Sequence, residues 1–101
     1  MKMNGRRGAK GFQVSSLPYM SKVYINGQVL IPAQLVRSLG ITRLERASIH
    51  LQYRGKNIFL ENIKLLRTRN TDSRQFTIPK NIREKYNIRS GEKIKIINIS
   101  K

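Results

Sequence analysis

One short motif occurs twice in the chain, and this duplication limits the folds open to it more than any other feature. Residues 27–41 (GQVLIPAQLVRSLGI) align with residues 74–88 (RQFTIPKNIREKYNI) at an offset of 47 residues. Each copy holds a Gln, a short apolar run, Ile-Pro and then apolar residues at helical spacing. A chance match over this length is improbable, so the sequence predicts two equivalent structural units in tandem.

Each copy predicts a short strand followed by a short helix. In the first copy, residues 28–31 end at Pro32, which suits the first helical position because its missing N–H would have no helical partner there. The helix is expected over residues 33–39, and Gly40 suits the left-handed conformation that ends helices. The second copy has the same order, with Asn87 in the place of Gly40.

Five further segments have the alternation or the β-branched content that is typical of strands. A hairpin is expected around the turn Arg54-Gly55-Lys56-Asn57. The segments are residues 20–25, 47–53, 58–60, 63–69 and 93–99. Together with the two copies of the motif, they predict a mainly β protein with short helices.

Charge is the strongest indication of function. The 101 residues hold 21 Lys and Arg but only 5 Asp and Glu, a formal net charge of +16, and residues 1–44 contain no acid. Such a charge repels itself unless a polyanion is near, so the expected partner is DNA or RNA. Residues 1–16 are rich in Gly, Arg and Lys and lack a hydrophobic period, which predicts a flexible basic arm.

The sequence offers no candidates for catalysis or for a cofactor site. It has no Cys and a single histidine, His50, within a predicted strand, so no metal site can be built around it. The acids are scattered singly, and no nucleophile–base pair or phosphate-binding loop is present. We therefore expect a protein that is not an enzyme and uses no cofactor. No apolar run approaches the ~20 residues of a membrane helix, so a cytoplasmic location on the nucleoid or the ribosome is expected, with no membrane partner.

The second copy and the strand after it resemble a known family. The string RQFTIPKNIREKYNIRSGEKIKI (residues 74–96) closely resembles the AbrB/SpoVT-type domain, the swapped-hairpin fold of bacterial transition-state regulators, archaeal basic DNA-binding proteins and some antitoxins. The first copy matches the pattern through Ile41 and then departs from it, with Leu44 where the family has Gly. The resemblance covers roughly residues 20–100.

The resemblance implies how the two copies combine. In that family, two chains interleave their hairpins into one β-barrel. With both copies in one chain, it implies a swapped-hairpin AbrB-like β-barrel formed as a single-chain pseudo-dimer, either monomeric or paired as a homodimer. It divides the chain into the arm (1–16) and the barrel (17–101), with copy one over 20–62 and copy two over 63–101. Copy two has no returning strand like residues 58–60 after it, so an open sheet edge or an imperfect symmetry is expected.

The resemblance also implies which side chains meet nucleic acid. In DNA-binding members, basic residues before the turn, at the turn and on the helix form one positive face. Arg83 occupies one of the helix Arg places and Arg37 the next one along. Val36 and Glu84 fill the complementary places, a departure that argues against symmetric recognition of palindromic DNA. With the arm included, the expected nucleic-acid-binding residues are Arg6, Arg7, Lys10, Lys22, Arg37, Arg67, Arg69, Arg74, Gln75, Lys80 and Arg83.

Three functions are consistent with these features. The resemblance favours a DNA-binding transcription regulator or chromatin-type protein that binds duplex DNA. The high charge and the arm are also typical of a structural RNA-binding protein, such as a small ribosomal protein. An antitoxin-like interaction module is the minor alternative. Gln28 and Gln75 either read base edges or cap their turns, and Tyr19 and Phe12 are candidates for stacking on a base.

Overall fold

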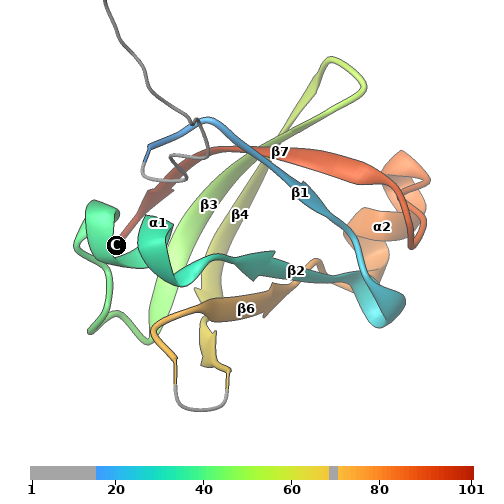
Figure 1. Cartoon of the computed structure of the whole chain (residues 1–101). Coiled ribbons are helices and arrows are strands. Elements are labelled where there is room, and N and C mark those ends of the chain that lie inside the picture. Colours follow the sequence, from blue (N-terminus) through green and yellow to red (C-terminus); the bar gives the residue numbers. More distant parts are fainter. Residues whose placement is uncertain (1–15, 69–70) are drawn as a thin grey trace, which may run out of the picture.

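Strands dominate the part of the chain that the structure, a computed structural model, describes, namely residues 16–68 and 71–101. In chain order (Figure 1), the elements are β1 (Tyr19–Lys22), the 3₁₀ turn η1 (Ile25–Gly27), β2 (Gln28–Ile31), α1 (Ala33–Leu39), β3 (Arg46–Tyr53), β4 (Lys56–Lys64), β5 (Leu66–Arg67), β6 (Arg74–Thr77), α2 (Lys80–Tyr86) and β7 (Lys93–Ser100). The prediction of a mainly β protein with short helices is confirmed.

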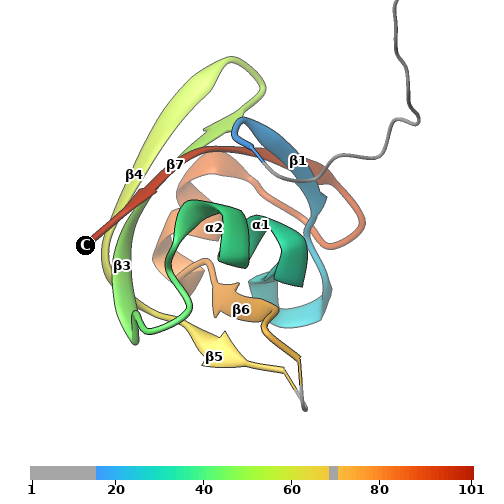
Figure 2. The same cartoon turned by 60° about the vertical axis from the view of Figure 1, so that its left-hand side comes forward.

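The strands form two antiparallel sheets. One has the order β1-β7-β3-β4 and the other the order β2-β6-β5. The two helices lie at opposite ends of the molecule in Figure 1, and Figure 2 shows the four-stranded sheet curving around them. Within the described residues, these pairings make two separate sheets and not the closed barrel that was expected.

The smaller sheet joins the two copies of the motif through a symmetric register. Val29 lies opposite Phe76, and Gln28 lies opposite Thr77. Moving both members of the Gln28–Thr77 pair by the repeat offset of 47 gives the pair Leu30–Gln75, which is also present. The β2–β6 ladder is therefore the same when the two copies exchange places.

At the centre of the larger sheet, two equivalent strands of the two copies also pair with each other. β3 spans residues 46–53 and β7 spans residues 93–100, again 47 apart, and the two strands pair with each other. β1 pairs with the outer side of β7, as β4 pairs with β3. The expected missing partner of the last strand is thus supplied by β1, and the edges of this sheet are β1 and β4.

The helices begin and end close to the residues that the sequence predicted. Pro32 has φ −59° and stands at the N-cap, one residue before the first helical residue rather than at it. Gly40 ends α1 at φ +69°, and Asn87 ends α2 in the same left-handed region at φ +56°. Ile41 and Ile88 then donate equivalent backbone hydrogen bonds, to Val36 O at 3.2 Å and Arg83 O at 2.8 Å.

Two predicted strands have different limits in the structure. The strand expected over residues 20–25 ends at Lys22, because Asn26 and Gly27 turn the chain with φ values of +63° and +77°. The strand expected over residues 63–69 divides between the end of β4 and the two-residue β5. The hairpin between β3 and β4, with its turn at Arg54-Gly55, is confirmed.

Both copies contribute to one hydrophobic core. Val29 and Ile31 of β2 are fully buried, as are Phe76 of β6 and the nearby Ile78. Phe76 is the largest of the fully buried side chains, and it lies opposite Val29 at the centre of the symmetric ladder. Burial of this pair ties the two copies together.

Phe76→Ala should therefore lower the free energy of unfolding by about 3–5 kcal/mol, because the substitution leaves a cavity at the centre of the core. Chemical denaturation followed by circular dichroism measures the change. Phe59→Ala is the matched control, since the Phe59 side chain is 68% exposed. A Phe76→Ala variant as stable as the Phe59→Ala variant would contradict this view of the core.

Candidate nucleic-acid interface

Seven of the expected nucleic-acid-binding residues lie in the part of the chain that the structure describes, and these seven fall in different places on the fold. Arg6, Arg7, Lys10 and Arg69 lie outside the described residues, as do residues 1–15 of the expected arm. The remaining seven divide among a buried site, an acid-paired cluster, helix α2 and the surface between β1 and β2.

Arg74 is buried, with 6% of its surface exposed. Its guanidinium donates to three backbone carbonyls: Nη1 to Asp72 O at 2.6 Å and to Ser73 O at 3.1 Å, and Nη2 to Thr42 O at 2.6 Å. A charged group with these partners is satisfied inside the protein and is not presented to a ligand. Arg74 therefore holds loops together in this structure.

Arg37 and Arg67 share one carboxylate. Arg37 Nη1 lies 3.1 Å from Asp72 Oδ2, and Arg67 Nη2 lies 3.8 Å from Asp72 Oδ1. Both arginine side chains are more than half exposed, so these ion pairs contribute little stability. The carboxylate nevertheless offsets part of the positive charge at this end of the molecule.

Arg83 crosses the turn before β2. Its Nε donates to Ile78 O at 2.9 Å, and a Cβ placed on Gly27 would come within 2.5 Å of the Arg83 side chain. Gly27 has φ +77°, so glycine suits both the backbone and the close approach. Lys80 is exposed at the first position of the same helix, α2.

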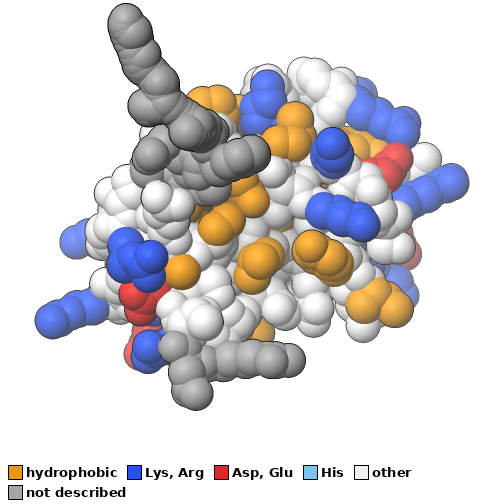
Figure 3. All heavy atoms as spheres, in the orientation of Figure 1, with side chains coloured by type: hydrophobic (Ala, Val, Ile, Leu, Met, Phe, Trp, Pro, Cys, Tyr) orange, Lys and Arg blue, Asp and Glu red, His pale blue; other side chains and the backbone are white. Residues whose placement is uncertain are grey.

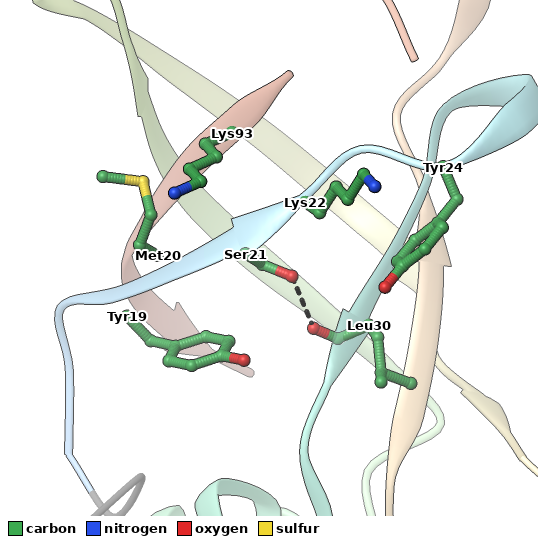
Figure 4. A pocket seen from close by; sticks show the side chains of 7 residues that line it. All are labelled: Tyr19, Met20, Ser21, Lys22, Tyr24, Leu30 and Lys93. Atoms are coloured by element: carbon green, nitrogen blue, oxygen red, sulfur yellow. Dashed lines mark hydrogen bonds between the residues drawn. The ribbon is translucent and has the colours of Figure 1, made fainter. Parts of the chain in front are cut away.

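Lys22 and Lys93 occupy opposite positions on two neighbouring strands, and Figure 4 shows the Lys22 ammonium directed toward Tyr24 and the Lys93 ammonium toward Met20. In the register of β1 and β7, Lys22 lies directly opposite Lys93, and both are exposed. Neither lysine forms an ion pair with an acid in the described part of the chain. At the other end of the same sheet, Arg46 of β3 lies opposite Lys64 of β4 in the same way. Like charges directly opposite each other destabilise a sheet, so both pairs have an electrostatic cost without an anion.

A hollow of about 310 Å³ adjoins the first of these pairs (Figure 4). Ser21 Oγ bridges from β1 to Leu30 O of β2 at 3.0 Å, and Tyr19 and Tyr24 point their hydroxyls toward Leu30 from either side. The Lys22 ammonium lies 5.8 Å from the centre of the Tyr24 ring. The hollow is lined by Tyr19, Met20, Ser21, Lys22, Tyr24, Leu30 and Lys93.

A second hollow, of about 370 Å³, continues from the first across β2 to β6. The two share Tyr24 and Leu30, and the second adds Ile25, Val29 and both predicted glutamines, Gln28 and Gln75. No acid of the described residues lines either hollow. We call the two hollows together the β1–β2 surface. Figure 3 shows exposed hydrophobic side chains across this face, with Lys and Arg side chains toward α2.

The nearest acid in sequence, Glu92, is held elsewhere. Its carboxylate accepts hydrogen bonds from the Tyr53 hydroxyl, from Arg54 Nη2 at 2.9 Å and from the Arg89 backbone N–H at 3.0 Å. These bonds, with that of Tyr53 foremost, lower the pKa of Glu92. Burial, and then the bond to Glu92, raise the pKa of Tyr53. The carboxylate is thus engaged away from Lys22 and Lys93.

Sequence reasoning missed Lys93 and most of the apolar part of the surface. Met20, Tyr24 and Ile25 are 50%, 47% and 71% exposed, and Tyr24 and Ile25 lie beyond the end of β1 although a strand was expected over residues 20–25. The turn residues Asn26-Gly27 were the available signal, since a strand that ends early leaves its last side chains outside the core. The pairing of Lys22 with Lys93 had no local signal, because the two positions are far apart in the chain.

Neither a metal site nor a membrane-spanning helix is found within residues 16–68 and 71–101. No group of three or more His, Cys, Asp or Glu side chains there could hold a metal ion. No helix there is long and apolar enough to cross a membrane. Comparison of the chain with protein-family models, curated proteins and solved structures finds no match.

Tyr53→Phe should raise the pKa of Glu92 toward its ordinary value, because the variant lacks the phenol that donates to the carboxylate. A lowered folded-state pKa stabilises the protein above the unfolded-state pKa, and this contribution is lost as the pH falls through the folded-state pKa. The variant should therefore lose less stability on acidification below about pH 4.3.

Carboxyl NMR titration of Glu92, with unfolding measured at neutral and acid pH, tests this expectation. Tyr86→Phe is the control, because the phenol that donates to the Glu92 carboxylate belongs to Tyr53, whereas the Tyr86 ring contacts Lys85. An unchanged Glu92 titration in Tyr53→Phe would show that the phenol does not set the pKa.

Proposed function

We propose that this chain is a nucleic-acid-binding protein that contacts the phosphate backbone through Lys22 and Lys93 at the β1–β2 surface. The observation that carries the proposal is the pairing of these two exposed lysines across β1 and β7, with no acid lining the adjoining hollow. Phosphates placed there would replace repulsion between the lysines with attraction, and would release counterions on binding.

The charge of the described residues supports this proposal. They include sixteen of the 21 Lys and Arg and all five acids, so the folded part is strongly basic without the residues before Ser16. Two of the five acids, Asp72 and Glu92, already form ion pairs with arginines, so they do not offset the charge of the lysines. A surface of this kind attracts polyanions over a range of about 8–10 Å at physiological salt.

We further propose that the fold is a single-chain pseudo-dimer of the swapped-hairpin type. The proposal is supported by the symmetric β2–β6 register and by the equivalent places of β1 beside β7 and β4 beside β3. On this basis, the repeats run from β1 to β3 and from β4 to β7, with the boundary at the turn Arg54-Gly55 rather than after residue 62. The pairs Lys22–Lys93 and Lys64–Arg46 then occupy equivalent places.

Duplex DNA is the ligand that the AbrB-like residue pattern favours, as expected for a regulator or chromatin-type protein on the nucleoid. Structured RNA presents the same phosphates, so an RNA-binding role on the ribosome is the alternative. A competition titration at two salt concentrations, with random duplex DNA and structured RNA as competitors, distinguishes them. Absence of binding to either at low salt would refute the proposed function.

The double variant Lys22→Gln, Lys93→Gln should weaken binding and reduce the slope of log affinity against log salt by about two, since ~0.9 counterions are released for each phosphate neutralised on duplex DNA. Fluorescence anisotropy with a labelled duplex across a salt series measures both quantities.

The matched control is Arg46→Gln, Lys64→Gln, which removes the equivalent pair from the other end of the same sheet. The proposal predicts a larger effect for the first double variant than for the control. Equal losses in both would mean that binding depends on net charge and that the β1–β2 surface is not the site.

A further inference from the structure

We propose that the β1–β2 surface binds unpaired bases, with one base stacked against Tyr24 in the hollow between β1 and β2 while Lys22 and Lys93 hold the adjoining phosphates. This inference rests on the proposed function and names the form of nucleic acid at the site: a strand with exposed base faces, from single-stranded DNA or an RNA loop.

The β1–β2 surface is apolar as well as exposed. Tyr24, Ile25 and Met20 are each about half exposed or more, and they lie close together around the two hollows. Met20 lines the first hollow, Ile25 the second and Tyr24 both, and exposed apolar side chains gathered around a hollow are typical of a binding surface. A sugar-phosphate backbone alone would leave these side chains in water, whereas a base would cover them.

The tyrosine rings are placed to accept a base. Tyr19 and Tyr24 approach Leu30 from either side, so the hollow has an aromatic ring at each end and an aliphatic side chain in its floor (Figure 4). Burial, and then the nearby Tyr24, raise the pKa of Tyr19. A neutral aromatic ring stacks on any base, because every base has a π face.

The positive charges lie at the rim of the same hollow. The Lys22 ammonium lies 5.8 Å from the Tyr24 ring centre, and Lys93 is the register partner of Lys22. The phosphates on either side of a stacked base would fall within reach of lysine side chains at the same ring. Cations beside an aromatic platform are the combination found where single strands bind without sequence preference.

The second hollow extends the same site. It starts at the Tyr24 and Leu30 that it shares with the first, and it ends at Gln28 and Gln75. Each side-chain amide offers both a donor and an acceptor, which suits the exposed edge of an unpaired base. Gln28 and Gln75, the two candidates for reading base edges, therefore lie beside the aromatic hollow.

A continuous duplex can contact Lys22 and Lys93 through its backbone, as the proposed function requires, but it does not use the apolar hollow. Its base faces are stacked on one another and its edges are paired, so it would offer the apolar hollow only its backbone. Charge complementarity also favours a nucleic-acid strand over a second copy of this chain, because a second copy would bring the same two lysines and the same net charge to the surface.

The test compares three probes on the full chain: a thymidine strand of about twelve nucleotides, an abasic strand with the same number of phosphates, and the duplex formed by the thymidine strand and its complement. The thymidine strand should bind roughly 5- to 150-fold more tightly than the abasic strand, the gain expected from stacking. Tyrosine fluorescence should be quenched by the thymidine strand and not by the abasic strand; the chain has four Tyr and no Trp, so no tryptophan emission masks this signal.

Tyr24→Leu keeps an apolar side chain but removes the ring, so it should abolish most of that gain and leave the affinity for the abasic strand unchanged. Phe59→Leu is the matched control, since it removes an exposed ring on β4 outside the two hollows. Circular dichroism of both variants confirms that the fold is retained, and Tyr24→Phe should restore binding.

Each other outcome overturns the inference. Equal affinity for the thymidine and abasic strands, with binding retained, would leave the proposed function standing and remove the stacking site. Equal loss in Tyr24→Leu and Phe59→Leu would place stacking elsewhere. Burial of the β1–β2 surface in a dimer, seen by sedimentation together with protection of Tyr24 from iodination, would assign it to a second copy. Failure of all three probes to bind would refute the proposed function itself.

Discussion

The pairing of β2 with β6 is the constraint on which the rest of the structure depends. Each of these four-residue strands comes from a different copy of the motif, and each is too short to be stable without the other. Val29 and Phe76 lie opposite each other in the ladder and are fully buried, so the contact between the two copies is part of the hydrophobic core. Because the ladder is symmetric, the short helices after the two strands, α1 and α2, lie at opposite ends of the molecule, as Figure 1 shows. The larger sheet then closes over the same core.

This arrangement explains why the charges lie where they do. The core occupies the facing sides of the sheets, and the cations remain on the outside with only five acids to balance them. Asp72 pairs with Arg37 and Arg67, and Glu92 pairs with Arg54. Neither acid lines the hollow beside Lys22 and Lys93 at the β1–β2 surface. The same place is where β1 ends early and exposes Tyr24 and Ile25. Charge and exposed apolar area coincide there, and this coincidence supports a nucleic-acid ligand that offers both phosphates and bases.

The sequence predicted local features well and long-range pairing poorly. The repeat, the helices after Pro32 and Pro79, and the left-handed ends at Gly40 and Asn87 all depend on neighbouring residues, and they are present. The partner of β7 depends on the tertiary fold, so the role of β1 was not foreseen. Arg74 illustrates the same limit at the site. It stands where the first copy has Gly27, and nothing in the local sequence indicates that its guanidinium turns inward to three carbonyls. The alternation of apolar residues was also extended too far at Tyr24, because Asn26 and Gly27 end the strand.

Cleavage of the chain at the turn Arg54-Gly55 tests the dependence on β2–β6 pairing most directly. The two fragments would carry β1 to β3 and β4 to β7, so each would hold one strand of the symmetric ladder and neither could bury Val29 or Phe76 alone. We predict that each purified fragment is unfolded by circular dichroism and by NMR amide dispersion, and that an equimolar mixture regains the spectrum of the intact chain. A fragment that folds independently would contradict this dependence, since its strands would then need no partner from the other copy.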